Sequence, residues 1–478
     1  MADPLLSDPD DFRSVLASVD RDGRRRWLHV HLIGGVWRRR RVLLAVLLIA
    51  FYLSLPFLTV GGHPFFRLDL PHRTFWIAGQ AFMPQDLWYF LILLLILGFA
   101  TLLAVATLGR VLCGWMCPHN VFLEMVYRPI ERLCQGPAGR RAVRKERNDP
   151  ARLPGLVATW VLYALVGGIL ANTMTAIFVG TEGWRWGFLI DPVAHPSGAV
   201  FFAIVFVVIW FDFAWFREQT CTIVCPYGRI QAVLLDPHSQ VVAYDSKRGE
   251  PRGHVAAGSV ATGATADSAA ATAPKGDCID CKLCVAVCPT GIDIRNGNQL
   301  ECIHCTACVD ACDGVMTRLG RPKGLVRYAS EAALSGQKRR LIRPRTIAYA
   351  VILLILITVA AIRIGGRQEL NAVLLRSTIP PVAISDDQGR PWIRNVVQLS
   401  LINHASTAQR AQLSIRAIPE AKLVSRHQDI DLPPHERHAE PVVIDLPAER
   451  FTGPDLDVVL VSTTATNQTE TKLRLRKP

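Results

Sequence analysis

The sequence carries little charge for its length. Only 19% of its 478 residues are Asp, Glu, Lys or Arg, whereas 50% are hydrophobic. This composition argues against an ordinary soluble protein and indicates membrane-spanning segments. Residues 1–22 lack the basic start and the apolar run of a signal peptide, so we expect the first apolar run to be retained as a helix. No G-x-G-x-x-G fingerprint follows an expected strand, so we expect no built-in NAD(P)H or FAD domain.

The chain also has too few cysteines for its length to be a disulfide scaffold. The chain has 13 cysteines, and most of them are clustered with two or three residues between neighbours. Such clusters favour metal ligation by reduced thiolates, which implies a reducing compartment. The net charge of +13 would suit nucleic acid or phospholipid. Because the basic residues are concentrated beside the apolar runs, we expect membrane lipid as a partner and no nucleic acid.

Five apolar runs are long enough to cross a bilayer: 42–60, 87–108, 155–179, 199–216 and 346–363. Asp212 interrupts the end of the fourth run, so four spans plus one buried helix is the alternative. Basic residues are dense before the first run, after the second and before the fifth. By the positive-inside rule the N-terminus and the long segment before the fifth run are cytoplasmic, and the region from about residue 365 is outside.

Two regions outside the spans have a composition of their own. Residues 253–275 are rich in small and polar residues that cannot bury a core, so they predict a flexible linker. After residue 365, short alternating runs separated by turn residues predict a small β-sandwich. The expected parts are a cytoplasmic tail, a four-helix transmembrane region, the linker, a cysteine-rich module, a fifth span and an outer domain: 1–41, 42–252, 253–275, 276–330, 346–363 and 365–478.

The strongest signal is a pair of motifs, C-x2-C-x2-C-x3-C-P from Cys278 and C-x2-C-x2-C-x3-C from Cys302. This is the bacterial two-cluster ferredoxin pattern, in which the fourth cysteine of each motif ligates the other cluster. We therefore predict two [4Fe–4S] clusters, one held by Cys278, Cys281, Cys284 and Cys312 and the other by Cys302, Cys305, Cys308 and Cys288. Two structural zinc sites are the alternative, but they would leave the third cysteine of each trio surplus. His304 is expected to be a solvated loop residue and not a ligand.

Two further strings, CGWMCP and CTIVCP, have the form C-x-x-x-C-P without the preceding cysteine pair. They follow the second and fourth spans, which indicates a parallel repeat of a helical hairpin and a cysteine string. If each span continues as a helix, residues four apart share one face. The thiols that then converge at the cytoplasmic surface are those of Cys113, Cys117, Cys221 and Cys225. The proline of each string ends that helix or begins the next.

The chemistry of these four cysteines has several readings. Soft thiolates prefer Cu(I) to Cu(II), so a thiolate site makes bound copper easier to reduce. The alternatives are a redox-active dithiol, contact with a cofactor, or burial as small hydrophobic side chains. Met116 is expected to pack against lipid or protein, and His119 is either a ligand or a polar cap. Cys134 is expected to be a structural or incidental thiol.

These residues carry a family resemblance. GRVLCGWMCP with VYRPIERL, LDLPHRTFWIAGQAFMPQDLWY and REQTCTIVCPYGRIQAVLLDPHSQ, together with the double ferredoxin motif, resemble the cytochrome c oxidase accessory proteins CcoG, FixG and RdxA. The resemblance covers nearly the whole chain, and the β-rich C-terminus is similar to that family's extracytoplasmic immunoglobulin-like domain. The linker at 253–275 is longer than usual in the family, which leaves the position of the ferredoxin module relative to the membrane open.

The resemblance implies assembly of cbb3-type cytochrome c oxidase at the bacterial inner membrane. Family members are understood to reduce Cu(II) to Cu(I) for the copper site of that oxidase, so the implied activity is that of a cupric reductase. The implied copper or electron-exit sites are the pairs Cys113 with Cys117 and Cys221 with Cys225. The implied partners are a cytoplasmic electron donor and oxidase subunits or copper chaperones.

Two other functions fit the same residues. One is an electron conduit between a cytoplasmic donor and membrane quinone, as in the related polyferredoxins of nitrate and nitrous oxide pathways. The other is a non-enzymatic scaffold that docks oxidase subunits and uses its clusters as a redox sensor. In each case the predicted fold class is a multi-domain membrane protein. It combines an α-helical bundle of about five spans, an α+β ferredoxin-like module and an all-β immunoglobulin-like sandwich.

Overall fold

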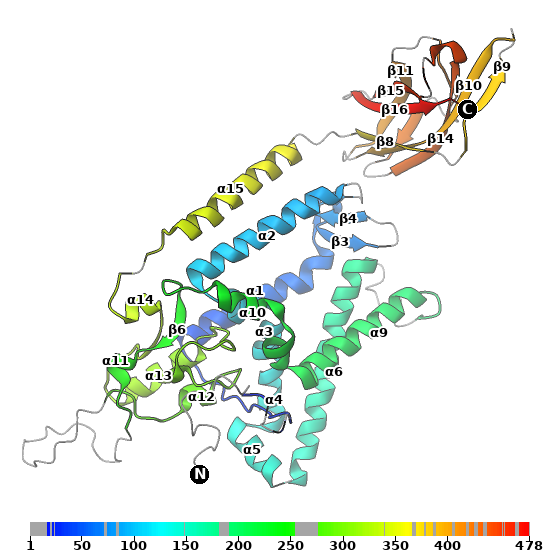
Figure 1. Cartoon of the computed structure of the whole chain (residues 1–478). Coiled ribbons are helices and arrows are strands. Elements are labelled where there is room, and N and C mark those ends of the chain that lie inside the picture. The colour runs from blue at the N-terminus through cyan, green and yellow to red at the C-terminus, as the bar shows by residue number, and fades with distance from the viewer. Residues whose placement is uncertain are drawn as a thin grey trace, which may run out of the picture. The chain divides into compact units, whose positions relative to one another are not determined.

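The computed structural model describes residues 17–477 apart from short gaps and two longer ones, at 181–190 and 254–275. Most of the predicted linker and the start of the predicted N-terminal tail therefore lie outside the described residues. The chain divides into two compact units, residues 1–56 with 88–357 and residues 57–87 with 358–478 (Figure 1). Each unit has its own hydrophobic core.

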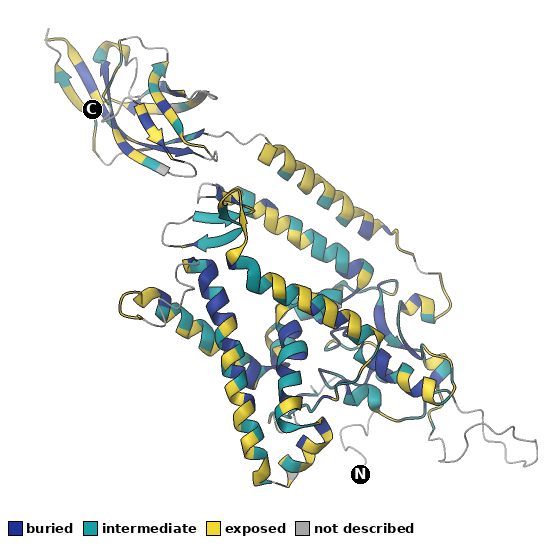
Figure 2. Cartoon of the chain, turned by 180° about the vertical axis from the view of Figure 1, so that it is seen from behind, coloured by how far each residue is buried: buried dark blue, intermediate teal, exposed yellow. Residues whose placement is uncertain are grey.

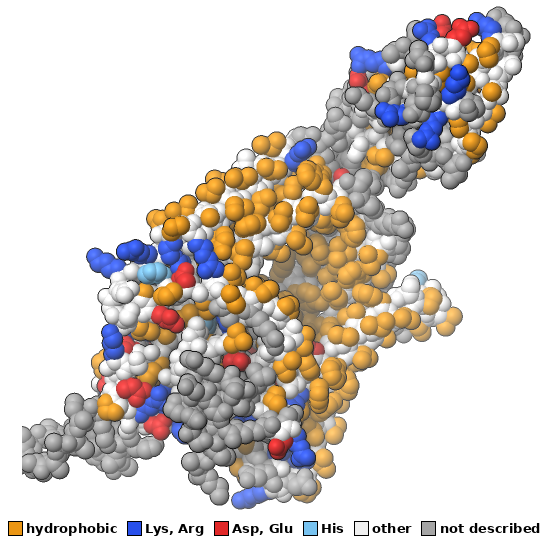
Figure 3. Space-filling view, in the orientation of Figure 1, with side chains coloured by type: hydrophobic (Ala, Val, Ile, Leu, Met, Phe, Trp, Pro, Cys, Tyr) orange, Lys and Arg blue, Asp and Glu red, His pale blue; other side chains and the backbone are white. Residues whose placement is uncertain are grey.

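In the described part of the chain, five helices are long and apolar enough to cross a membrane. They are α1 (Val36–Ser54), α2 (Leu87–Leu108), α6 (Leu153–Val179), α9 (Pro196–Phe211) and α15 (Pro344–Gly365). Most of their apolar side chains are exposed or half-buried, as Figure 2 shows by colour and Figure 3 shows for the face that carries α2 and α15. Apolar surface of this extent suits lipid and not water. The five helices agree with the five predicted apolar runs.

The fourth run is a helix with outward-facing side chains and not a buried core helix. Gly198 is the one buried residue of α9. The helix ends at Phe211, and Asp212 begins a π-helical turn, Asp212–Phe216. The Asp212 carboxylate accepts a hydrogen bond from Thr220 and lies 2.9 Å from the His119 ring nitrogen Nδ1. The acid that interrupts the apolar run therefore lies in a polar cluster at the end of the helix.

A series of short helices follows the first cysteine string: α3 (Pro118–Phe122), a π-helical turn Leu123–Tyr127, α4 (Arg128–Gln135) and α5 (Ala138–Glu146). Several of their charged side chains are buried, and these are paired. Arg128 lies 2.5 Å from Glu124. Arg141 and Arg217 each lie 2.5 Å from a different carboxylate oxygen of Glu131. Pairing of this kind is required because an uncompensated buried charge is strongly destabilising.

The cysteine-rich module is small and mostly loop. Its regular elements are α11 (Ser246–Gly249), α12 (Leu283–Ala286), α13 (Ala307–Arg318), α14 (Glu331–Leu334) and a two-stranded antiparallel sheet of β6 (Val241–Tyr244) and β7 (Val326–Ala329). Because β6 precedes the predicted linker, the module extends upstream of the predicted boundary at residue 276. The helix α10 (Pro226–Leu234) connects the second cysteine string to this sheet.

The two ends of the linker meet. The Gly253 backbone N–H donates to the Cys278 carbonyl at 3.1 Å, and the Gly276 N–H donates to the Pro251 carbonyl at 3.0 Å. The residues on either side of 254–275 are therefore joined to each other within the module. The length of this insertion consequently does not decide where the module lies relative to the helices.

The second unit is built of strands. Between α1 and α2 lie a hairpin of β1 (Thr59–Val60) and β2 (His63–Pro64) and a three-stranded sheet of β3 (Phe66–Asp69), β4 (Thr74–Ile77) and β5 (Gln80–Phe82). After α15 come β8 (Leu370–Arg376), β9 (Val382–Ser385), β10 (Pro391–Asn403), β11 (Gln409–Arg416), β12 (Lys422–Val424), β13 (Asp429–Leu432), β14 (Arg437–Pro447), β15 (Asp455–Thr463) and β16 (Gln468–Arg476).

The C-terminal strands form two antiparallel sheets. One has the order β12-β14-β10-β8 with β9 paired to β10, and the other has the order β13-β11-β15-β16. Alternate residues such as Leu399, Leu401, Val442 and Ile444 are buried in a shared core, as the period of two predicts. The alternating runs of the sequence after residue 365 are 396–402, 411–415, 441–446, 456–461 and 472–475, and all of them fall within strands. In the described residues the structure adds four shorter strands that the pattern missed, β8, β9, β12 and β13.

A variant with a shortened linker tests whether residues 254–275 are an insertion that the module does not need. Residues 254–275 are replaced by a short Gly/Ser segment in the full-length protein. We expect unchanged iron and sulfide content per chain, because the hydrogen bonds that join residues 251–253 to 276–278 remain. A shorter loop also costs less closure entropy, on the order of 1 kcal/mol, so the temperature of cluster loss, followed by visible absorbance, should not fall. Loss of iron in this variant would contradict the interpretation of residues 254–275 as an insertion and would favour a tether.

Candidate functional site

Both ferredoxin motifs have the same unusual backbone. Asp280 and Lys282 in the first motif have φ angles of 51° and 55°, and the equivalent His304 and Thr306 in the second have 54° and 63°. Left-handed φ is uncommon outside glycine. Lys282 and Thr306 are each the residue before a helix, α12 or α13, whose first turn carries the third cysteine. The two loops therefore wrap in the same way around a space that their cysteines face.

The structure brings together the first predicted ligand set. Cys278, Cys281, Cys284 and Cys312 line one cavity. Its other walls are mainly apolar and include Tyr244, Ile279, Leu283, Val315, Met316, Leu325 and Val326. Four cysteines around a space with apolar walls suit a cluster held by four thiolates. The assignment of these residues as iron ligands stays a prediction.

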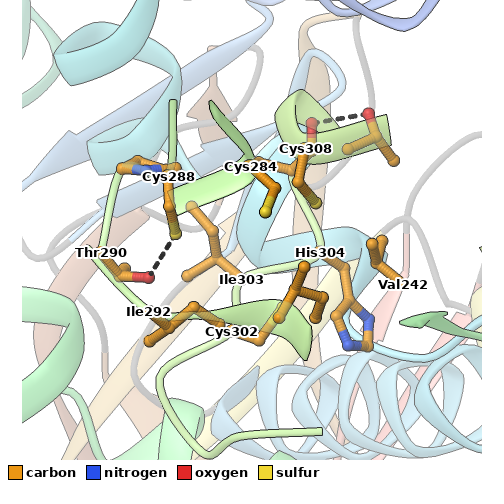
Figure 4. A pocket seen from close by; sticks show the side chains of 13 residues that line it. Val242, Cys284, Cys288, Thr290, Ile292, Cys302, Ile303, His304 and Cys308 are labelled. Atoms are coloured by element: carbon orange, nitrogen blue, oxygen red, sulfur yellow. Dashed lines mark hydrogen bonds between the residues drawn. The ribbon is translucent and has the colours of Figure 1, made fainter. Parts of the chain in front are cut away.

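The second predicted set lines a neighbouring cavity, seen in Figure 4. The cysteines of this set are Cys288, Cys302, Cys305 and Cys308. Cys284 also lines this cavity, so the two spaces share a wall. The Cys288 sulfur lies 3.4 Å from the Thr290 hydroxyl, the kind of contact that tunes the potential of a cluster. Among the described side chains, no three His, Cys, Asp or Glu are arranged to hold a single metal ion.

The expectation of a solvated His304 is wrong. Its exposed fraction is 0%, and its Nδ1 accepts a hydrogen bond of 3.1 Å from the Arg110 backbone N–H. Burial lowers the pKa of His304 to about 3, and the positive charge of Arg110 adds to this effect. The neutral ring is therefore an acceptor that joins the second cluster loop to the chain just after α2.

The cluster module lies against the ends of the membrane helices. The Asp310 carboxylate of α13 accepts hydrogen bonds from the backbone N–H groups of Trp37 at 3.1 Å and Arg38 at 2.8 Å. A carboxylate at this place also interacts favourably with the helix dipole of α1. The Tyr328 hydroxyl of β7 donates to the Leu108 carbonyl at the last residue of α2, at 2.8 Å. The start of α1 and the end of α2 thus meet the same module.

The first cysteine string contacts the second cluster loop directly. The Arg110 guanidinium donates to the Cys302 carbonyl at 3.1 Å. A Cβ atom on Gly114 would lie 2.4 Å from the Ile303 carbonyl oxygen and 3.1 Å from the Cys305 backbone. The Arg41 side chain of α1 donates to the Gly114 carbonyl at 3.1 Å. Glycine is therefore required at position 114, because any side chain would push the string away from the loop.

The strings do not continue the membrane helices. Their geometry was predicted on the condition that they do. α2 ends at Leu108, and Gly109 has a φ of 69°. Each string instead forms a π-helical turn, Leu112–Met116 or Thr220–Val224. The second cysteine of each is extended and lies just before the helix that its proline begins, α3 or α10. The two strings therefore share one local structure, as their repeated sequence predicts.

The four thiols of the strings come together. The Cys113 sulfur lies 3.3 Å from the Gln231 side-chain oxygen, and the Cys221 sulfur lies 3.5 Å from the Asn120 side-chain oxygen. Burial raises the pKa of Cys113 to about 12, and the nearby Cys117 adds to the rise. Burial likewise raises the pKa of Cys221, with Cys117, Cys113 and Cys225 contributing. The Cys113 and Cys221 thiols are therefore protonated at neutral pH, and a metal ion must displace these two protons to bind there.

Asn120 and Gln231 were not anticipated from the sequence. The Asn120 amide group contacts both strings, because its nitrogen donates to the Cys113 carbonyl at 2.8 Å while its oxygen faces Cys221. Gln231 is fully buried on α10 beside Cys113. A polar residue shortly after each string, on an otherwise apolar face, was the available signal. It could not be interpreted without knowing that the strings meet.

The roles of Met116, His119 and Cys134 differ. Both His119 ring nitrogens are engaged, Nδ1 with Asp212 and Nε2 with the Arg217 carbonyl, each at 2.9 Å. Of the two alternatives for His119, a ligand or a polar cap, these contacts support the polar cap. Met116 is 46% exposed on the surface of the string. Cys134 is half-buried and lines a separate cavity beside α6.

Comparisons with known protein families agree with this organisation. Residues 216–331 match the family described as "4Fe-4S dicluster domain". Residues 89–141, which include the first string, match "4Fe-4S binding domain". Residues 361–477 match the "IG-like fold at C-terminal of FixG". The iron–sulfur character and the immunoglobulin-like nature of the C-terminal sandwich are thereby confirmed.

Curated relatives match over most of the chain. The nitrogen fixation protein FixG of Rhizobium meliloti is 35% identical over 64% of this chain and 58% of its own length. Protein RdxA of Cereibacter sphaeroides is 30% identical over 80% of this chain and 81% of its own length. Protein RdxB of the same organism is 31% identical over 73% of this chain and 72% of its own length. The chain belongs to the FixG/RdxA family of iron–sulfur electron-transfer proteins.

Proposed function

We propose that this protein reduces Cu(II) to Cu(I) at the four C-x-x-x-C-P thiols with single electrons from two [4Fe–4S] clusters. The observation that carries the proposal is the contact between the first string and the second cluster loop. Gly114 packs directly on the backbone of Ile303 and Cys305, with no side chain between them. A proposed electron carrier thus adjoins a group of soft metal ligands.

The proposed electron route has three stages. Electrons enter at the cavity of Cys278, Cys281, Cys284 and Cys312, pass to the cavity of Cys288, Cys302, Cys305 and Cys308, and leave toward the strings. The bound clusters supply one-electron storage. The residues of the chain fix the spacing and exclude water, since His304, Cys302, Cys305 and Cys308 are all buried. Each Cu(II) gains one electron from the clusters, and a cytoplasmic reductant then returns one electron to the clusters.

The chemistry of the thiols favours this substrate. Copper in its lower oxidation state prefers soft sulfur ligands, so a thiol-rich site raises the potential of bound copper and favours its reduction. The four cysteines are neighbours but are not arranged around one ion position. Copper binding in this proposal therefore draws the thiols together and releases their protons. Release of reduced copper to an acceptor returns them to the arrangement described above.

The orientation and the partners are part of the proposal. The density of basic residues before α1, after α2 and before α15 supports a cytoplasmic N-terminus and a cytoplasmic cluster module in the bacterial inner membrane. The immunoglobulin-like domain then lies in the periplasm. Oxidase subunits or copper chaperones are the proposed receivers of the copper, and the biological role is assembly of a cbb3-type cytochrome c oxidase.

Removal of one thiol pair tests the copper step. The double variant Cys113→Ser/Cys117→Ser is reduced anaerobically, freed of excess reductant and mixed with Cu(II). Cluster reoxidation is followed by absorbance and by EPR, and Cu(I) is measured with a chromogenic chelator. We expect a full complement of iron and sulfide but copper reduction slowed at least about tenfold, a usual loss when the surroundings of a metal are altered.

Cys134→Ser is the matched control, because this cysteine lies outside both the strings and the cluster motifs. It should reduce Cu(II) at the wild-type rate. If the double variant reduces copper at an unchanged rate, the substituted thiols take no part in the reaction. Reoxidation of the clusters by a quinone analogue but not by Cu(II) would replace copper with membrane quinone as the acceptor.

The close contact at Gly114 gives a second test. Gly114→Ala leaves every thiol and every predicted cluster ligand in place but forces the string away from the second cluster loop. We expect electron transfer to Cu(II) to slow by about tenfold or more, since small displacements of reacting groups cost this much. Gly314→Ala in α13 is the control, because a Cβ there meets no neighbouring atom. Equal rates in the two variants would mean that electrons leave by another path.

A further inference from the structure

A cavity of about 290 Å³ lies in the first unit, away from the clusters and the strings. Its walls come from α4, α5, the first turns of α6 and the segment that carries Trp27 and His29. The volume is close to that of a small-molecule site. Neither the electron route nor the copper step uses this cavity.

Positive charge dominates its lining. The cationic side chains are those of Arg141, Arg144, Lys145, Arg152 and Arg217. Among the described residues of the lining, the one acidic side chain is that of Glu131, which already lies 2.5 Å from Arg141 and from Arg217. Burial raises the pKa of Glu131, but these two arginines outweigh it and hold the pKa at about 2. Among the described side chains, Lys145 and Arg152 have no carboxylate partner, so the cavity carries excess positive charge.

Two buried donors in this lining have no hydrogen-bond partner among the described residues. They are the Nε atoms of Arg141 and Arg217, and the Arg217 Nε lies 3.8 Å from the Glu218 carboxylate in an ion pair. The two side chains are only 7% and 4% exposed. Leaving a buried donor without an acceptor is destabilising, and more so for a charged group. Such donors are expected where a ligand that accepts hydrogen bonds completes the site.

Part of the cavity wall is apolar and belongs to a candidate membrane helix. Leu156 and Trp160 line the cavity from the first turns of α6, which is a candidate span. Trp160 is 37% exposed, and tryptophan is enriched at the boundary between lipid and water. A ligand that fits both walls is anionic at one end and apolar at the other. Basic pockets between membrane helices bind acidic lipid headgroups in this way.

We propose that this cavity binds the phosphate headgroup of an anionic phospholipid. The phosphate accepts from the guanidinium groups of Arg141 and Arg217 and neutralises the charge of Lys145 and Arg152. The start of the acyl chains lies against Leu156 and Trp160. Arg217 also holds His119 through its carbonyl, at 2.9 Å, so the lipid braces the turn that precedes the second cysteine string.

The test measures lipid binding to the detergent-purified, cluster-loaded protein by native mass spectrometry. Dioleoyl phosphatidylglycerol and dioleoyl phosphatidylcholine are titrated separately. We expect one preferred phosphatidylglycerol molecule per chain. Lys145→Gln/Arg152→Gln should weaken this binding roughly thirtyfold, because each basic residue near an acidic headgroup contributes about 1 kcal/mol. Neither side chain pairs with a described carboxylate, so the fold and the visible absorbance of the clusters should be unchanged.

The control variant is Arg140→Gln/Arg147→Gln, which removes the same charge from exposed positions of the same segment outside the cavity. It should bind phosphatidylglycerol as the wild type does. Equal binding of the two lipids, or equal losses in the two double variants, would overturn the proposal. Inorganic phosphate is added in a separate arm. If phosphate alone displaces the lipid at an equal concentration of phosphate groups, the site takes a small anion and the lipid assignment is wrong.

Discussion

Arginine side chains that reach backbone carbonyls hold the cluster module against the membrane helices. Arg110 donates to the Cys302 carbonyl at 3.1 Å, and Arg128 donates to the Pro289 carbonyl at 3.0 Å. Both arginines are almost fully buried. Arg128 is compensated by Glu124 at 2.5 Å and by Glu218 at 3.5 Å. Because buried charges must remain paired, this network fixes the cluster loops, the strings and the helix ends in one arrangement.

The same network changes the meaning of the positive charge in the sequence. Counted along the chain, Arg110, Arg128 and Arg141 are among the loop charges from which the orientation of the spans is predicted. In the folded protein they are buried, and each has a defined partner. Charges that predict an orientation from the sequence thus also bind the loop to the cluster module in the folded chain. Further positive charge gathers at the cavity beside α6.

Local sequence predicted those parts of the structure that depend on local spacing. The period of two located the long strands, the apolar runs located the five helices, and the cysteine spacing identified the two sets that the fold brings together. His304 could not be understood in this way, because its burial depends on Arg110, far away in the chain. The condition that each span continues as a helix into its string is not met either. Gly109 and the close packing of Gly114 on Ile303 break the helix, and both are tertiary effects. The ligand roles of the cysteines still rest on their spacing.

The two cluster cavities share a wall, and this has a consequence for the electron donor. Cys284 lines both cavities, so the two centres are near neighbours inside one small core. Two one-electron centres in this relation can accept both electrons of a two-electron reductant and then release them singly. With the proposed copper step as the one-electron acceptor, such a module would suit a donor that gives its electrons in pairs. A single cluster would leave such a donor half-oxidised as a radical after each transfer.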